Sequence, residues 1–170
     1  MTELQSPYPG MLICGIITNN SIAADAESAL AALFGPITIR SKTLDFDFTS
    51  YYEQEMGLNL LRFWTGFEKT VQPERLYEFK LATNNLEQKF ASHGKRKVNL
   101  DPGILSLHNL ILATTKNYAH RIYLGHGIYA ELTMIYHSGR YRPLEWTYPD
   151  YKTETCQEFL ARCRKFLINH

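Results

Sequence analysis

Residues 11–18 read MLICGIIT, an almost uninterrupted apolar run with the length of one β-strand. A run without polar alternation indicates a strand that is buried on both of its faces. Over 22–34 the apolar residues recur at helical spacing, which predicts a helix. Asn20 or Ser21 is suited to cap the start of this helix, and Gly35 is suited to end it. The fold therefore opens with a buried strand that leads directly into a helix.

Two further strands and a second helix follow this opening unit. Apolar and polar residues alternate over 37–48, which predicts a half-exposed strand, and 58–65 predicts a second strand antiparallel to it. Pro73 suits the first turn of a helix over about 72–92. The stretch 97–100 is a brief strand. The order strand, helix, strand, strand, helix, strand is that of the ferredoxin-like split βαβ arrangement.

The remainder of the chain extends this arrangement. Asp101-Pro102-Gly103 is typical of a turn or of a helix N-terminus, where Asp101 would serve as a cap. We predict an α+β fold: a ferredoxin-like sandwich whose mostly antiparallel sheet carries helices on one face, in a single domain over 11–170 behind a flexible arm at 1–10. The other segments are 104–115, which fits either a helix or a strand, strands over 120–124 and 127–136, an edge segment over 140–146, and a closing amphipathic helix over 153–168.

Composition excludes several classes of protein. The 170 residues are 45% hydrophobic and 21% charged, as in an ordinary globular protein, which rules out a disordered chain or a coiled coil. The net charge of +1 creates no global field for nucleic acid or an anionic membrane. No apolar run is long enough for a membrane span, and the first ten residues do not form a secretory signal. Three cysteines without a CxxC pair argue against structural zinc and favour the cytoplasm.

Two polar segments suggest weak candidate sites. Asp45 and Asp47 are two residues apart, so on a strand both carboxylates would face one side, either to hold a hard cation or simply to face water. The basic triplet 95–97 precedes a predicted strand and would either hold a phosphate or form a solvated loop. The alternative to capping for Asp101 is a carboxylate held at the end of a strand.

The densest polar set lies in ATTKNYAHRIYLGHGIYAE, residues 113–131. Charges on alternating strands of a compact domain are partly buried and therefore need partners. We predict that this set neutralises a small anionic ligand that carries a phosphate or is a nucleotide; an internal ion-pair network is the alternative. Whether a reaction follows, and with which cofactor, stays open. The ligand-binding candidates are Lys80, Arg96, Lys116 and Arg121, and the catalytic candidates are His120 for proton transfer with Glu131 or Asp101 to orient it or to hold a divalent ion.

A different class of function is also open, namely a non-catalytic module that self-associates, for example as a homodimer. The chain has 11 tyrosines, a residue type enriched in interface cores. The aromatic turn WTYPDY at 146–151 would either stack a base or a sugar or cover an edge of the sheet. RNA binding is a weaker expectation because the RNP patterns are absent.

Several long blocks resemble a known family. They are YYEQEMG (51–57), FKLATNNLE (79–87), RKVNLDPG (96–103), LATTKNYAHRIYLGHGIYAE (112–131) and WTYPDY (146–151). In these blocks the sequence is similar to a bacterial family of uncharacterised proteins, domain of unknown function 4416, of which some members are labelled GTP-binding protein. The resemblance implies no catalytic residue. A GTP site here would need a pocket of its own kind, because the sequence has no Walker-type loop and no NKxD motif.

Overall fold

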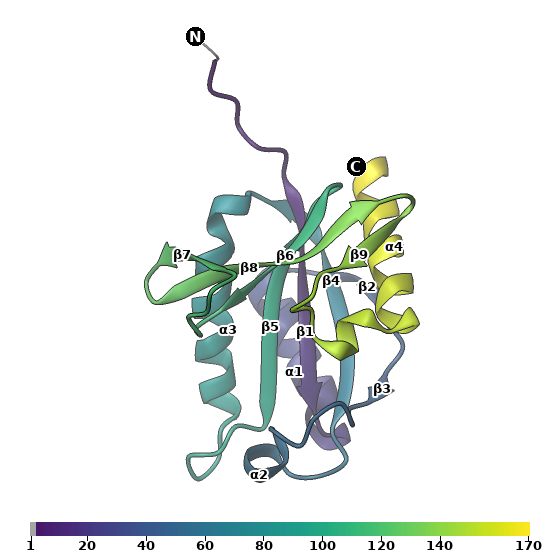
Figure 1. Ribbon diagram of the computed structural model, residues 1–170. Coiled ribbons are helices and arrows are strands. Elements are labelled where there is room, and N and C mark those ends of the chain that lie inside the picture. Colours follow the sequence, from purple (N-terminus) through teal and green to yellow (C-terminus); the bar gives the residue numbers. More distant parts are fainter. Residues whose placement is uncertain (1–2) are drawn as a thin grey trace.

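A computed structural model describes residues 3–170 of the chain as an α+β fold built on one nine-stranded antiparallel sheet. The helices α1 and α3 cover one face of the sheet and α4 covers the other (Figure 1). Residues 3–9 form no helix or strand; residues 1–2 of the predicted arm lie outside the described residues. The elements are β1 (Gly10–Thr18), α1 (Asn20–Phe34), β2 (Ile37–Arg40), β3 (Leu44–Asp45), α2 (Glu53–Met56), β4 (Leu61–Val71), η1 (Pro73–Arg75), α3 (Leu76–Phe90), β5 (Val98–Leu105), β6 (Asn109–Thr114), β7 (Arg121–Gly125), β8 (Ile128–His137), β9 (Arg140–Pro143), η2 (Pro149–Lys152) and α4 (Glu154–Asn169).

Strand β1 lies in the middle of the sheet and is buried over its whole length. It pairs with β4 on one side and β5 on the other. Its alternate side chains enter two separate cores: Leu12 and Ile16 pack beneath α1 and α3, whereas Met11 and Ile13 pack beneath α4. The continuous apolar run is thus explained by helices on both faces, because each face of the strand has to be covered.

The strand order is β2-β4-β1-β5-β6-β8-β7, with β3 on β4 and β9 on β8. The predicted strands over 120–124 and 127–136 and the closing helix are confirmed as β7, β8 and α4. The prediction that the helices of the sandwich lie on one face is confirmed for α1 and α3, and the closing helix α4 packs its apolar residues on the opposite face. No helix within residues 3–170 is long and apolar enough to cross a membrane.

Three local predictions are wrong for identifiable reasons. The cap of α1 is Asn19, whose side chain accepts a hydrogen bond from the Ile22 amide. The alternating stretch 37–48 divides into the short strands β2 and β3, and its last residues form a loop. Asp101-Pro102-Gly103 lies inside β5 rather than in a turn, because β1 pairs with all three residues. Long-range pairing overrides the turn preference of this tripeptide.

The sheet opens between β5 and β6. These strands pair only where Gly103 to Leu105 face Leu110 to Leu112, so the first half of β5 has a neighbour on its β1 side alone. We call this gap, between residues 98–102 of β5 and the end of β6, the fork. At the fork Ala113 and Thr114 of β6 pair with β8 alone, whereas the earlier residues Leu110 to Leu112 pair with both β5 and β8. A buried strand edge needs other partners for its amides and carbonyls, since an unpaired polar group in the interior costs about 1–3 kcal/mol.

Two charged side chains of α3 serve the open edge of β5. Glu87 Oε1 accepts a hydrogen bond of 2.6 Å from the Leu100 amide, and Lys80 Nζ donates one of 2.8 Å to the Leu100 carbonyl. Alternate residues of a strand direct their amides to the same edge, so the amide of residue 102 would also face the gap. Proline at this position removes a donor for which no strand offers an acceptor.

The substitution Glu87→Ala leaves the buried Leu100 amide without its acceptor. We expect the free energy of unfolding to fall by about 1–3 kcal/mol, measured by urea denaturation. Glu78→Ala on the same helix is the matched control, because its exposed ion pair with Arg75 contributes about 0–1 kcal/mol. Equal losses in the two variants would contradict the role of Glu87 at the strand edge.

Candidate functional site

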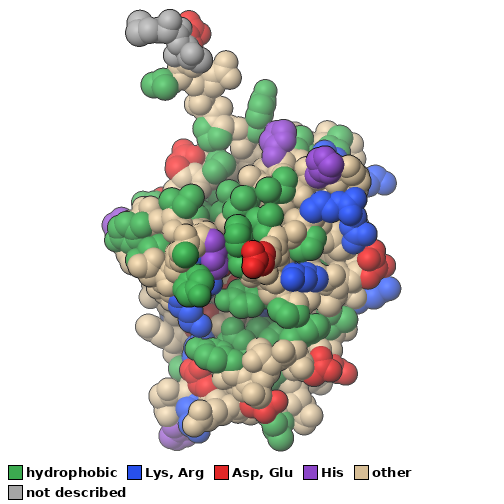
Figure 2. Space-filling view, in the orientation of Figure 1, with side chains coloured by type: hydrophobic (Ala, Val, Ile, Leu, Met, Phe, Trp, Pro, Cys, Tyr) green, Lys and Arg blue, Asp and Glu red, His purple; other side chains and the backbone are tan. Residues whose placement is uncertain are grey.

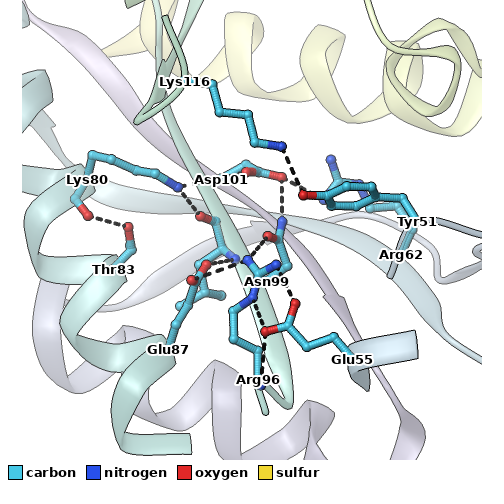
Figure 3. Close-up of polar contacts among 11 residues, drawn as sticks. Tyr51, Glu55, Arg62, Lys80, Thr83, Glu87, Arg96, Asn99, Asp101 and Lys116 are labelled. Atoms are coloured by element: carbon cyan, nitrogen blue, oxygen red, sulfur yellow. Dashed lines mark hydrogen bonds and ion pairs between the residues drawn. The ribbon is translucent and has the colours of Figure 1, made fainter. Parts of the chain in front are cut away.

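A cavity of about 880 Å³ lies beside the fork in the sheet. Its walls come from α3, from the open half of β5, from β6 to β8, from the loop before α2 and from η2. Aromatic side chains supply much of the wall, and charged residues meet at the β5 side (Figure 3). The aromatic residues of the lining are Phe46, Phe48, Tyr51, Tyr52, Tyr148 and Tyr151.

Asp101 stands at the centre of the charged residues. Its Oδ2 accepts a hydrogen bond of 2.9 Å from Asn99 and lies 3.5 Å from a guanidinium nitrogen of Arg62. Lys80 Nζ lies 3.9 Å from Oδ1. Lys80 and Arg62 approach from opposite sides of β5, as Figure 3 shows. Burial, and next the negative charge of Asp101, raise the pKa of Tyr52 above its usual value.

Arg62 is 1% exposed and is held by two carboxylates. Its Nε lies 2.8 Å from Asp150 Oδ2, in addition to the contact with Asp101. Burial opposes its charge, yet its pKa lies above the usual value because its anionic neighbours outweigh the loss of water. Gly15 of β1 makes room for this arrangement: a Cβ there would lie 3.0 Å from Arg62 and 2.7 Å from the Tyr151 hydroxyl.

Arg96 joins the cavity to α2. Its Nε and a terminal nitrogen donate to the two carboxylate oxygens of Glu55 at 2.9 and 2.7 Å, the paired geometry that makes such contacts strong. The same guanidinium donates to Asn99 and lies 3.7 Å from Glu87. The pKa of Glu55 is lowered, chiefly by these hydrogen bonds, whereas burial raises the pKa of Glu87.

Arg121 and Glu131 form a buried ion pair between β7 and β8. Arg121 Nε donates to Glu131 Oε2 at 2.8 Å, and the other nitrogens reach the Lys116 carbonyl and the Tyr148 hydroxyl. His120 Nε2 lies 3.3 Å from the same carboxylate oxygen, and its ring stacks on Trp146. The internal ion pair weighed as an alternative for this segment is therefore present.

Lys116 differs from the other cations of the cavity. Its ammonium lies 4.7 Å above the ring of Tyr51 and donates a 3.4 Å hydrogen bond to the hydroxyl of that residue. It forms no ion pair with a carboxylate of residues 3–170. Lys116 is exposed and thus accessible to a ligand at the rim.

The structure brings together most of the candidate residues predicted from the sequence. Asp101 contacts Arg62 and Lys80 rather than capping a helix, and it does not contact His120. His120 touches Glu131 but does not line the cavity. The predicted residues that line it are Lys80, Arg96, Asp101, Lys116, Arg121 and Glu131.

The sequence reasoning missed the most deeply buried charge of the site. Arg62 stands alone in the apolar stretch LLRFWTGF, residues 60–67, and a single charge inside such a run indicates a buried ion pair. Glu87 gave a weaker signal, because it follows Lys80 by two helical turns and so shares its face. Asp150 and Tyr151 gave no signal of this kind.

The other motifs have ordinary surroundings. Asp45 and Asp47 are exposed, and Phe46 and Phe48 are half-buried, as in the solvent-facing interpretation of this pair. In the aromatic turn, Trp146 donates a hydrogen bond to the Leu132 carbonyl and so covers β8. Residues Tyr148 to Tyr151 of the same turn line the cavity.

Fold and cavity together define an α+β protein with a pocket of aromatic and charged residues at a fork in its sheet. The chain matches the family model described as "Domain of unknown function (DUF4416)" over residues 8–166 and belongs to that family. No curated protein and no solved structure matches the sequence.

The ion pair between Glu55 and Arg96 predicts a specific dependence on pH. The folded state lowers the pKa of Glu55, so the stabilisation is present above the usual value of 4.5 and is lost as the pH falls through the folded value. We expect the stability difference between wild type and Glu55→Gln, from urea denaturation at each pH, to shrink below pH 4.5. Glu53→Gln on the same helix is the control, and a constant difference for Glu55→Gln would contradict the prediction.

Proposed function

We propose that the protein binds a small anionic ligand, one that bears a phosphate or is a nucleotide, in the cavity beside the fork. The observation that carries the proposal is the exposed ammonium of Lys116 on the aromatic rim formed with Tyr51. A cation over a ring offers an anion both charge and a flat apolar surface. Arg121 supports this rim by holding the Lys116 carbonyl.

Proton transfer in this site is a further part of the proposal. His120 lies outside the lining, so it would exchange a proton with the cavity only through Glu131, which lines the cavity 3.3 Å from its Nε2 and would also orient the ring. Asp101 would not orient His120, since its contacts are with Arg62, Lys80 and Asn99; its remaining proposed role is to hold a divalent ion. Binding alone requires none of these steps.

Two broader assignments belong to the same proposal. A ferredoxin-like split βαβ core is supported by the antiparallel order β2-β4-β1-β5 and by the crossover helices α1 and α3 on one face. A cytoplasmic location is supported by three free, buried cysteines at positions 14, 156 and 163, since oxidising compartments favour disulfides.

A thermal-unfolding screen against nucleotides, sugar phosphates and inorganic phosphate tests the ligand proposal. A ligand at a hundred times its dissociation constant adds about 2.7 kcal/mol, which raises the midpoint of a chain of this size by about 5–10 °C. We expect such a shift with at least one phosphate compound and its loss in Lys116→Met. Lys69→Met, an exposed lysine outside the cavity, is the control. A flat screen refutes the proposal.

A second candidate function is self-association through β7. This strand ends the sheet, and its consecutive residues Ile122 and Tyr123 are 71% and 60% exposed. A group of hydrophobic side chains lies at the left margin of Figure 2, at the height where Figure 1 places β7. At the other end of the sheet, Arg162 donates to the Arg40 carbonyl of β2 and partly covers that edge. A bare apolar edge favours pairing with another strand.

The partner that β7 suits is a second copy of the same strand. In an antiparallel pair centred on Tyr123, Ile122 of one copy would face Leu124 of the other, so apolar side chains would meet without a buried charge.

Sedimentation velocity tests this pairing. We expect a concentration-dependent dimer for the wild type and a monomer for Ile122→Lys, because lysine at an edge prevents strand pairing. Leu33→Lys on α1 replaces an equally apolar, 46% exposed residue and should leave the dimer intact. A wild type that stays monomeric at high concentration rules out this function.

A further inference from the structure

Charge inside the cavity is already neutralised by the protein itself. Four of the cations that line it, namely Arg62, Lys80, Arg96 and Arg121, each lie within 4.0 Å of a carboxylate oxygen. The carboxylates in these contacts are Glu55, Glu87, Asp101, Glu131 and Asp150. Five carboxylates against four cations leave no positive excess for a chain of phosphates to occupy.

The carboxylates of the lining would in addition repel a second negative group placed deeper in the cavity. Asp101 and Glu131 both belong to the lining, and like charges repel each other more strongly where protein replaces water around them. Lys116 is the one lining cation without a carboxylate partner among residues 3–170. The site therefore offers one accessible positive charge, and it lies at the rim.

The surroundings of Lys116 are flat and aromatic. Tyr51 lies beneath the ammonium and is itself 61% exposed, and Tyr148, 48% exposed, is held by Arg121 next to the Lys116 backbone. Phe46 and Phe48 continue the wall towards the interior. Exposed rings of this kind stack on planar groups, and stacking contributes about 1–3 kcal/mol per base.

Resting on the proposed function, we infer that the ligand is a planar aromatic body with a single phosphate group, such as a nucleoside monophosphate, and not a polyphosphate. The anionic group binds Lys116, and the planar body stacks on Tyr51. Each phosphate beyond the first meets no unpaired cation and adds little affinity.

Isothermal titration with adenine and guanine compounds, without divalent cations, tests the inference. The series contains the nucleoside, the mono-, di- and triphosphate, and ribose 5-phosphate. We expect the monophosphate of at least one base to bind about tenfold or more tighter than both its nucleoside and ribose 5-phosphate. Further phosphates should change its affinity less than about threefold, since no unpaired cation awaits them.

Variants assign the two halves of the ligand. Lys116→Met should reduce the affinity for the monophosphate to that for the nucleoside. Tyr51→Leu should weaken the monophosphate about tenfold and leave ribose 5-phosphate unchanged. Tyr8→Leu, an 89% exposed tyrosine outside the cavity, is the matched control and should change neither.

The outcomes separate the inference from the proposal beneath it. A triphosphate that binds tenfold or more tighter than the monophosphate overturns the single-anion inference and leaves anion binding in place. Ribose 5-phosphate that binds as well as the monophosphate overturns the aromatic half. If no compound of the series binds, the proposed function fails together with the inference.

Discussion

The open edge of β5 at Leu100 is the constraint on which the site depends. The strand is buried, but β6 has already turned away from it, so the backbone needs other partners. Lys80 and Glu87 fill the place of a strand, and each brings a charge into the interior. A buried charge needs a counter-charge. Asp101 is the counter-charge of Lys80, and Arg96 is the counter-charge of Glu87. The polar network beside the cavity thus follows from one missing strand pairing.

The same constraint explains why the cavity separates charge from access. Side chains that hydrogen-bond to the unpaired backbone groups of β5 stay in their ion pairs, because a buried ion without its partner costs about 3–5 kcal/mol. Lys80 and Glu87 are committed in this way to the strand edge. Lys116 is exposed and lies on the connection after β6, away from the backbone groups of β5 that lack a strand partner. In the proposed function, a ligand would therefore exchange at the rim while the interior keeps its ion pairs.

The local pattern of apolar residues predicted those strands and helices that have a continuous apolar face. The run 11–18 and the periodicity of 153–168 carried enough information because each has a continuous apolar face. Pro102 and Gly103 misled, because both residue types favour turns whereas β1 here holds them in a strand. That pairing joins segments about ninety residues apart in the chain. No window of sequence contains such a contact, so local preference alone assigns the tripeptide to a turn.

In the candidate site, too, the sequence gives the type of each residue but not its ion-pair partner. From their charges we predicted that four residues belong to one site, and all four line the cavity: Lys80, Arg96, Asp101 and Lys116. Their pairing could not be read in advance, since it is decided by the fork in the sheet. Arg96 lies just before β5 and Lys116 just after β6, so both are cations at the end of a strand. Of the two, Arg96 alone forms ion pairs with carboxylates of residues 3–170. The distinction between a structural and an accessible charge is therefore a property of the fold, and in the proposed function this distinction would set the number of negative groups on the ligand.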